Sequence, residues 1–311
     1  MGDLLVLRVL LSAITGVLER GPVLMTTASH LPRIFDEFCD GVDVVRLSRS
    51  SKDLLPFIRA WQKHFDFLYL GPHPTMKTVM LGWLLAPGRL WLRRYPERPP
   101  YLVEQLRADI AAFGLPAPQL DQVLANALPW RVPLDHPRPG DGAPFLALHA
   151  GAKQGWQTTR WPLEKWRALI RQILEKSNHS VCLLGIASES EMLASLRNPL
   201  PRSLRSRFSL SLAQPLERVA ALILSSSGVI CHNSGILHLA TFLKKRTLSL
   251  TGSSASCWRP SYPWVMNISS GQCELACNCY RCPIPFYHAR CINGLTVEKV
   301  WQAVRNHLLE G

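Results

Sequence analysis

Short apolar segments alternate with amphipathic segments along most of this 311-residue chain, and this alternation constrains the fold more than any other feature. Apolar runs at 145–150, 180–185 and 228–233 are typical of strands, and the segment that opens at Pro162 has the apolar spacing of a helix. Strands that alternate with helices form parallel sheets with helical crossovers. The sequence therefore predicts an α/β fold. A content of 47% hydrophobic residues excludes wholesale disorder.

The remaining predicted elements follow the same rhythm. We expect further strands at 22–28, 43–47, 65–71 and 247–252, and further helices at 31–39, 53–64, 75–85, 101–114, 215–227, 235–243 and 296–309. Pro56 must lie in the first turn of its helix, because a proline further in removes a backbone hydrogen bond.

The distribution of prolines predicts two domains. Seven prolines stand between Leu115 and Pro144 inclusive, which is the composition of a linker. We therefore expect an N-terminal domain over 1–125, a Pro-rich linker over 126–144 and a C-terminal domain over 145–311.

Positive charge is concentrated in the second half of the chain. The net charge is +13, and residues 143–311 carry 19 Lys and Arg against 8 Glu, which gives +11. This half should attract anions such as nucleotides, phosphosugars, nucleic acid or an anionic membrane surface. An ordinary solvated basic surface is the alternative interpretation of the same composition.

We expect no segment to cross a membrane, because the most apolar stretch, Leu4–Leu18, is broken by Arg8 and is too short. It also lacks the basic start of a signal peptide, since Asp3 stands there. The nine cysteines are an odd number without a secretory context, which favours reduced thiols or a metal site in the cytosol.

A polar segment, His232–His238, follows the predicted strand at 228–233 and opens the next helix. Asn233 or Ser234 can cap that helix. Gly235 lets an anion approach the backbone at the helix start, and His238 lies one turn further on. The alternative is an ordinary helix cap beside a histidine of the core.

Two more polar loops follow strands of this half. In the loop at 151–162, Lys153 and Arg160 can neutralise a diphosphate, and the hydroxyls of Thr158 and Thr159 can donate hydrogen bonds to it. The third loop, at 251–254, contains Gly252 and is a candidate phosphate nest. Each loop by itself is also compatible with an ordinary polar connection. Because the carboxyl ends of parallel strands meet at one edge of a sheet, the three loops together predict a nucleotide-diphosphate site without a Walker motif.

The C-terminal half resembles glycosyltransferase family 9, the ADP-heptose:lipopolysaccharide heptosyltransferases. The resemblance is carried by L-H-A-G-A and T-T-R-W-P-L-E-K-W within 148–166, by L-L-G-I-A-S-E at 183–189 and by N-S-G-I-L-H-L-A at 233–240, followed by T-L-S-L-T-G and a Cys-rich tail. The similarity is strong over 145–300 and fainter over 1–115.

This resemblance implies a GT-B architecture, in which two Rossmann-like domains face a cleft, with the donor in the C-terminal domain and the acceptor in the N-terminal domain. It implies an inverting transfer of a sugar, heptose in the family, from an ADP-activated donor to a lipopolysaccharide-core or lipid A-type acceptor. No cofactor is required for such a transfer. The basic charge fits a cytoplasmic enzyme that is peripheral on the inner membrane.

The resemblance also assigns the donor site. Together with the chemistry of the loops, the resemblance implies a donor site that consists of Lys153, Thr158, Thr159, Arg160, Glu189, Asn233, Ser234, Gly235, His238 and Gly252. Asn233 stands where the family has Asp, so a charged contact with the donor sugar becomes a neutral one. Thr159 stands where the family has a basic residue, so Arg160 or Lys153 would serve the phosphates.

The family's catalytic carboxylate lies in a Gly-Asp pair after the first strand, and the matching pair here is Gly2-Asp3. Asp3 is therefore the candidate general base, against the alternative of an Asp in a first helical turn. Because the chain starts at Met1, we expect the N-terminal sheet to lack its first strand. A start site assigned too late, a truncated gene product and a genuinely degenerate variant are the explanations considered.

The sequence is compatible with two other functions. A non-catalytic relative that binds a nucleotide sugar or partners with active enzymes would fit Asn233, Thr159 and the missing strand. A nucleic-acid-binding protein would fit the net charge, but the basic residues are scattered and no recognised module is present.

Five cysteines form a cluster with the spacing C-x3-C-x-C-x2-C-x8-C. They are Cys273, Cys277, Cys279, Cys282 and Cys291. Thiolates at such density can hold a structural Zn or Fe ion, and a reduced or redox-sensitive loop is the alternative. Three of the other cysteines, Cys39, Cys182 and Cys231, lie in apolar patterns and are expected in the core.

Overall fold

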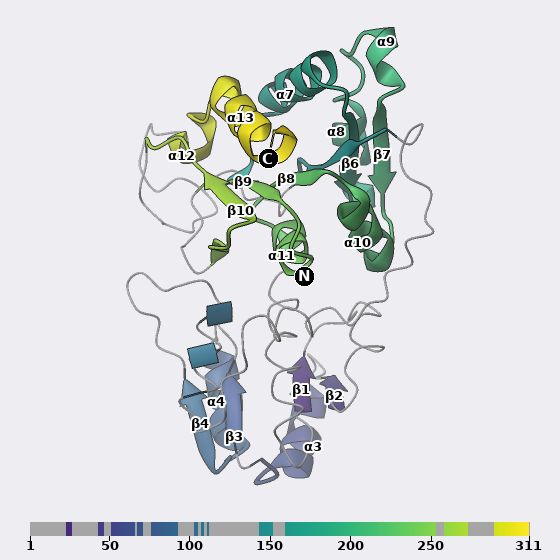
Figure 1. Cartoon of the computed structure of the whole chain (residues 1–311). Coiled ribbons are helices and arrows are strands. Elements are labelled where there is room, and N and C mark those ends of the chain that lie inside the picture. The colour runs from purple at the N-terminus through teal and green to yellow at the C-terminus, as the bar shows by residue number, and fades with distance from the viewer. Residues whose placement is uncertain are drawn as a thin grey trace. The chain divides into compact units, whose positions relative to one another are not determined.

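The computed structural model describes residues 23–26, 43–46, 51–65, 67–70, 76–92, 103–104, 107–108, 111, 143–151, 159–252, 258–272 and 289–310. The chain divides into two compact units, one within Ile14–Pro99 and one that includes Pro100–Gly311. Both units contain parallel strands connected through helices (Figure 1). The predicted α/β fold class is therefore confirmed. Within the described stretches, no helix is both long enough and apolar enough to cross a membrane.

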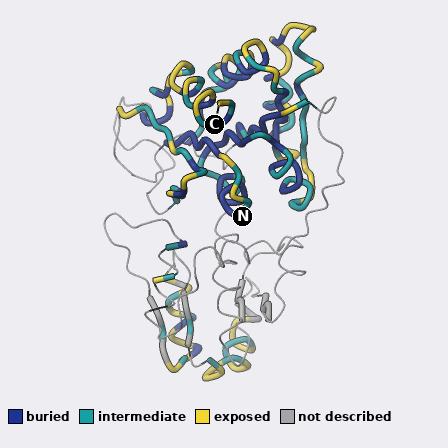
Figure 2. Tube along the Cα trace, viewed as in Figure 1, coloured by how far each residue is buried: buried dark blue, intermediate teal, exposed yellow. Residues whose placement is uncertain are grey.

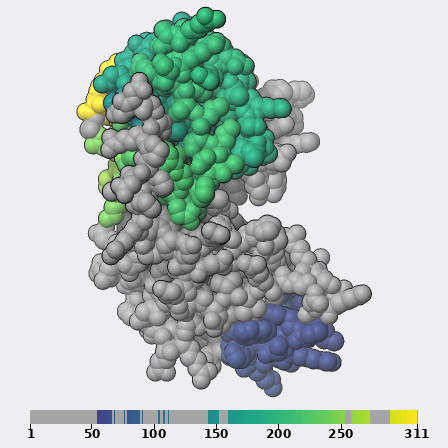
Figure 3. Space-filling view, turned by 90° about the vertical axis from the view of Figure 1, so that its right-hand side faces the viewer, coloured from purple at the N-terminus to yellow at the C-terminus, as the bar shows by residue number. Residues whose placement is uncertain are grey.

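The unit within Ile14–Pro99 contains two pairs of parallel strands. β1 (Val23–Thr26) pairs with β2 (Asp43–Arg46), and β3 (Phe67–Leu70) pairs with β4 (Arg89–Leu92). The helices of this unit are α3 (Ser51–Trp61) and α4 (Met76–Leu84). Figure 3 shows described residues of this unit at the molecular surface.

The prediction for Pro56 is wrong. Helix α3 begins at Ser51, so Pro56 lies in its second turn and not in its first. The serine and lysine that precede Asp53 extend the helix toward the N-terminus, and the proline ring then leaves one main-chain carbonyl without its helical partner. The cost is limited because Pro56 is still close to the start of the helix.

The second unit is built on a six-stranded parallel sheet with the strand order β10-β9-β8-β5-β6-β7. The strands are β5 (Phe145–His149), β6 (Ser180–Gly185), β7 (Phe208–Leu212), β8 (Gly228–His232), β9 (Thr247–Leu250) and β10 (Val265–Ile268). The four central strands are almost continuous apolar runs. This pattern is expected when helices cover both faces of a parallel sheet.

Helices lie on both faces of this sheet. They are α7 (Leu163–Lys176), η2 (Ala187–Glu189), α8 (Ser190–Ala194), α9 (Arg202–Arg205), α10 (Leu216–Ser225), α11 (Gly235–Phe242), α12 (Arg290–Asn293), α13 (Val297–Val304) and a π-helical turn η4 (Arg305–Leu309). In Figure 1, α7 and α13 lie side by side on one face, and α10 and α11 lie on the other.

The core of this unit is formed where these layers meet. Helix α7 buries Trp166, Leu169, Ile170 and Ile173 against the sheet, because these residues recur at the i, i+3, i+4, i+7 spacing of one helical face. Figure 2 shows the central strands as the most continuously buried part of the described chain. The carboxyl ends of the same strands therefore have a rigid support.

Several predictions concern residues that the structure does not describe. Residues 1–22, which include the expected position of the missing strand, and residues 126–142 of the predicted linker lie outside the described ranges. The domain boundaries at 125 and 145 and the absence of a first strand thus stay predictions.

Candidate functional site

The carboxyl edge of the six-stranded sheet brings together segments that are far apart in the sequence. Because all the strands are parallel, β5, β6, β8 and β9 end at the same edge. Gly151 follows β5, Glu189 ends the turn after β6, and Asn233 and Thr251 follow β8 and β9. The described parts of the three predicted loops do lie at one edge.

His232, the last residue of β8, connects two of these segments. It is fully buried, its Nε2 atom accepts a hydrogen bond from the main-chain N–H of Trp161 at 2.9 Å, and its Nδ1 atom lies 3.1 Å from the carbonyl oxygen of Gly151. Nε2 can accept only when it carries no proton, so Nδ1 carries the proton and donates to Gly151. His232 therefore fixes residues on both sides of the 152–158 segment.

The histidines at this edge are neutral at pH 7. The pKa of His232 is lowered to about 4, chiefly by burial and also by the nearby Arg160, while the hydrogen bond with Gly151 acts in the opposite direction. Burial and His232 lower the pKa of His149 to about 3. Burial also lowers the pKa of His238 to about 4. Positive charge for an anionic ligand must therefore come from arginine or lysine side chains.

Helix α11 begins at this edge. Ser234 is its N-cap residue, but no side-chain hydrogen bond caps the first turn. The Ser234 hydroxyl lies instead 3.4 Å from Nδ1 of His149. Main-chain N–H groups at the start of Gly235–Phe242 thus have no capping side chain, which is the arrangement in which a helix N-terminus binds an anion.

Asn233 and Arg259 hold the ends of the third loop. The Asn233 amide donates through Nδ2 to the carbonyl oxygen of Trp258 at 3.0 Å, and Arg259 donates to the carbonyl oxygen of Gly252 at 3.3 Å. The Trp258 ring meets the buried His238 ring edge-on, with 5.9 Å between centroids. Trp258 therefore contacts the end of β8 through Asn233 and helix α11 through His238, two residues of the 233–240 motif.

Glu189 lies beside the end of β5. Its side chain is buried, and Oε2 accepts a hydrogen bond from the N–H of Ile186 at 3.3 Å. A Cβ atom at Gly151 would overlap the Glu189 carboxylate, so a larger residue at this position would have to displace that carboxylate. The carboxylate is thus placed at the carboxyl edge, and the family resemblance counts Glu189 among the donor-site residues.

Some of the predicted site residues lie at the carboxyl edge, and others lie outside the residues that the structure describes. Asn233, Ser234, Gly235, Glu189 and Gly252 lie at the edge itself. Thr159 is buried just before Arg160, and Arg160 is close enough to His232 to affect its pKa. Three predicted residues, Asp3, Lys153 and Thr158, lie outside the described residues.

Only one member of the predicted metal cluster is described. Cys291 is buried in α12 and belongs to the apolar core, and Cys273, Cys277, Cys279 and Cys282 lie outside the described residues. Among the residues with a described placement, no group of His, Cys, Asp and Glu could hold a metal ion. The Zn or Fe site stays a prediction. Cys182 and Cys231 are buried in the core, as expected.

Comparison with known proteins identifies the family. Residues 92–288, more than half of the chain, match the model of glycosyltransferase family 9 (heptosyltransferase). The chain belongs to this family. The matched range contains every described residue of the candidate site.

Individual relatives are distant. Lipooligosaccharide heptosyltransferase 2 of Haemophilus influenzae is 27% identical over 119 residues, which cover 38% of this chain and about a third (34%) of that relative. E. coli ADP-heptose LPS heptosyltransferase II has 16% identity and a TM-score of 0.68, with 99% of this chain and 96% of that chain covered. A family 9 glycosyltransferase from Veillonella parvula has 13% identity and a TM-score of 0.73, with coverage of 100% and 95%. These solved structures confirm the fold, of the GT-B type.

The sequence did not predict the role of His232. Its partners are 71 and 81 residues away, and no local pattern distinguishes it from an ordinary core histidine at the end of a strand. The only available signal was its position directly before the Asn-Ser-Gly motif.

Proposed function

We propose that this protein is an inverting glycosyltransferase that transfers a sugar, heptose in the first instance, from an ADP-activated donor to a lipopolysaccharide-core-like acceptor. The observation that carries the proposal is the meeting of three family 9 motif segments at one sheet edge, around the uncapped start of α11. Family membership supports the class of reaction. The name of the E. coli structure, an ADP-heptose LPS heptosyltransferase, supports the donor and acceptor.

The proposed chemistry is a single displacement. An acceptor hydroxyl attacks the anomeric carbon, its proton passes to a carboxylate that we assign to Asp3, and the bond to the diphosphate breaks so that ADP leaves. The start of α11 and the cations Arg160 and Lys153 would stabilise the charge on the leaving diphosphate. Because the buried histidines are neutral, these two cations are the main counter-charges in the proposal.

As part of the same proposal, we infer that the protein acts at the cytoplasmic surface of the inner membrane. An acceptor of the lipopolysaccharide type is held in a membrane, and the second half of the chain has a net charge of +11. Basic surfaces are attracted to anionic leaflets.

A thermal unfolding experiment with ADP, UDP, GDP and CMP tests the donor. A ligand present at about 100 times its Kd stabilises a protein by about 2.7 kcal/mol, which raises the Tm of a chain of this size by a few degrees. We expect ADP to raise the Tm most, and Arg160→Gln to weaken ADP binding at least tenfold, with Arg202→Gln on the exposed helix α9 as a matched control. A cooperative transition that no nucleotide shifts would contradict the proposal.

One observation favours the alternative of a non-catalytic family member. The Asn233 amide is used as a donor to the Trp258 carbonyl, a bond that the family's usual aspartate cannot make. Under this alternative the protein would bind ADP, and single-turnover assays with ADP-heptose would give no transfer. Transfer of heptose to a lipopolysaccharide-core acceptor would rule the alternative out.

A further inference from the structure

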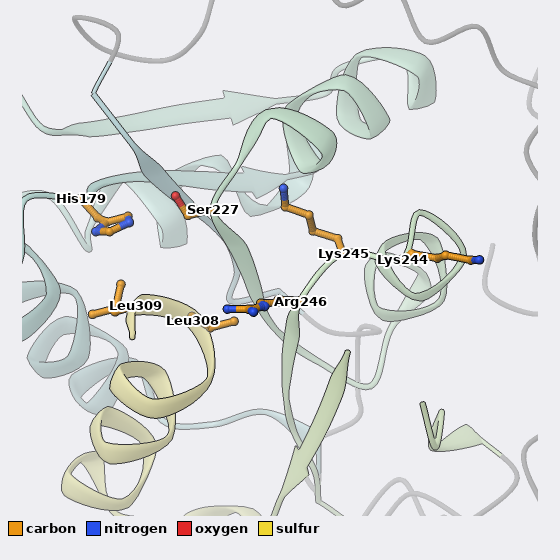
Figure 4. Close-up of a pocket in the computed structure, with 7 residues that line it drawn as sticks. All are labelled: His179, Ser227, Lys244, Lys245, Arg246, Leu308 and Leu309. Carbon is orange, nitrogen blue, oxygen red and sulfur yellow. The ribbon is translucent and has the colours of Figure 1, made fainter. Parts of the chain in front are cut away.

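The amino edge of the six-stranded sheet, opposite the edge with the candidate donor site, has a pocket of about 430 Å³ (Figure 4). Its lining residues are His179, Ser227, Lys244, Lys245, Arg246, Leu308 and Leu309. None of these residues belongs to a family 9 motif segment described above. A volume of this size accommodates a small organic ligand.

The topology explains why these residues meet. His179, Ser227 and Arg246 directly precede β6, β8 and β9, and the amino ends of parallel strands lie at one edge. The C-terminal turn η4 closes the pocket with Leu308, which packs so closely on Gly228 that a Cβ atom there would overlap its side chain. One wall of the pocket is therefore apolar and the other is basic.

The charge of the pocket has one sign. Three consecutive cations, Lys244–Arg246, line it, and none of the seven lining residues is acidic. In Figure 4 the side chains of Arg246, Ser227 and His179 surround a common space, whereas Lys244 extends away from it. Lys245 donates to the carbonyl oxygen of Leu224 at 2.9 Å, and an ammonium group has two further N–H donors.

Two polar groups of the pocket have no protein partner. Within the described part of the chain, no hydrogen bond or ion pair is recorded for the Arg246 guanidinium, and the buried Nδ1 atom of His179 has no hydrogen-bond partner. Burial and the nearby Arg207 lower the pKa of His179, so its ring is neutral at pH 7 and offers one N–H. A buried polar atom without a partner is uncommon in folded proteins, so the Nδ1 atom of His179 points to a ligand. The Arg246 guanidinium is exposed, and its N–H donors are available to bind one.

We propose that this pocket binds a phosphate group, held by Arg246 with Ser227, His179 and Lys245, and that the two leucines contact the carbon atoms attached to the phosphate. A planar guanidinium binds two phosphate oxygens at once. Such a phosphate is found on membrane glycerophospholipids and on small soluble phosphate esters. The proposal is independent of the transferase reaction.

The test uses the full-length protein with saturating ADP, so that the carboxyl edge is occupied. Isothermal titration with sn-glycerol 3-phosphate and with inorganic phosphate at low ionic strength measures the soluble source. Co-sedimentation with phosphatidylcholine vesicles, with and without phosphatidic acid, measures the lipid source. Arg246→Gln and Ser227→Ala test the pocket, and Arg202→Gln is the matched control, because Arg202 is an equally exposed cation of the same unit outside the pocket.

We expect saturable binding in at least one arm, weakened at least tenfold by Arg246→Gln and changed less than twofold by Arg202→Gln. Glycerol 3-phosphate binding without vesicle binding identifies a soluble ligand, and the reverse identifies a lipid headgroup. Absence of binding in both arms would overturn the proposal, and so would equal losses in the Arg246 and Arg202 variants. Circular dichroism and the ADP-induced Tm shift serve as folding controls. Both should be unchanged in each variant if the substitution affects only the pocket and not the fold.

Discussion

His232 is the residue on which the geometry of the candidate site most depends. Its two ring nitrogens bond to main-chain groups of Gly151 and Trp161, and its ring meets the ring of Trp166 edge-on, with 5.5 Å between centroids. A small side chain at this position would leave a buried donor and a buried acceptor without partners. It would also leave a cavity beside Trp166.

We therefore expect His232→Ala to lower the free energy of unfolding by about 2–4 kcal/mol and to weaken ADP binding. Urea denaturation and nucleotide titration measure the two effects. His64→Ala, on the exposed surface of the other unit, is the control and should change neither quantity. Full stability in the His232 variant would show that its two hydrogen bonds are dispensable.

The buried histidines also predict how stability depends on pH. The folded-state pKa of His232 and of His238 is about 4, below the ordinary value of 6.5, so the unfolded chain binds more protons between these values. The stabilisation is complete above pH 6.5 and is lost as the pH falls toward 4. We expect a loss on the order of 1–2 kcal/mol per histidine between pH 7 and pH 5. Urea midpoints at pH 7, 6 and 5 measure it, and a smaller slope is expected in His232→Asn.

A prediction for Asn233 follows from its donor role. Asn233→Asp replaces the amide N–H with a carboxylate that faces the Trp258 carbonyl oxygen. We expect a loss of about 1–3 kcal/mol in the free energy of unfolding and faster proteolysis within 252–258. Limited proteolysis and urea denaturation test this, and an unaltered cleavage pattern would refute the anchoring role.

At the residue scale, the sequence predicted which residues gather at the carboxyl edge and not how they are used. Asn233 or Ser234 was expected to cap α11, but no side-chain hydrogen bond caps this helix and the Ser234 hydroxyl lies near His149. The donor-sugar contact of Asn233 stays a prediction, and the bond from its amide to the Trp258 carbonyl was not predicted. These contacts join residues 25 to 85 positions apart, and local patterns contain no information at that range.

At the scale of elements, Gly151, two residues after the end of β5, lies close to Glu189 of η2. Gly151→Ala places a methyl group on the Glu189 carboxylate, so we expect the free energy of unfolding to fall by about 1–3 kcal/mol. Adding Glu189→Ala removes the obstacle, and the double variant should regain most of that loss. A double-mutant cycle by urea denaturation measures the coupling. Additive effects of the two changes would show that Glu189 moves aside freely.

Most elements of the second unit were predicted within two residues, because buried parallel strands are apolar runs and α7 has a regular apolar stripe. Two edge strands were missed. β7 alternates Phe208, Leu210 and Leu212 with serines, a weaker signal than a continuous run, and β10 is a four-residue strand that is only partly buried. The predicted helix at 296–309 is α-helical only to Val304 and continues as a π turn.

For the whole molecule, the core of the second unit predicts that this unit folds without the first. Every member of the main hydrophobic cluster that the structure describes comes from residues 146–309. The Tyr262 hydroxyl donates to Glu104 at 3.4 Å. We expect a fragment over 100–311 to unfold cooperatively and to retain ADP binding, as measured by calorimetry and by the ADP-induced Tm shift. A broad, non-cooperative transition would contradict this expectation.

The bonds of His232 have a consequence for the diversity of such enzymes. They hold main-chain groups of Gly151 and Trp161, between which nine residues, 152–160, stand in the sequence, and no side chain of those nine takes part in either bond. Because both anchor points belong to the sheet unit and not to the stretch between them, we expect sequence changes in this stretch to be tolerated by the fold. Under the proposed function, grafting the stretch from one relative into another would test whether it sets donor preference.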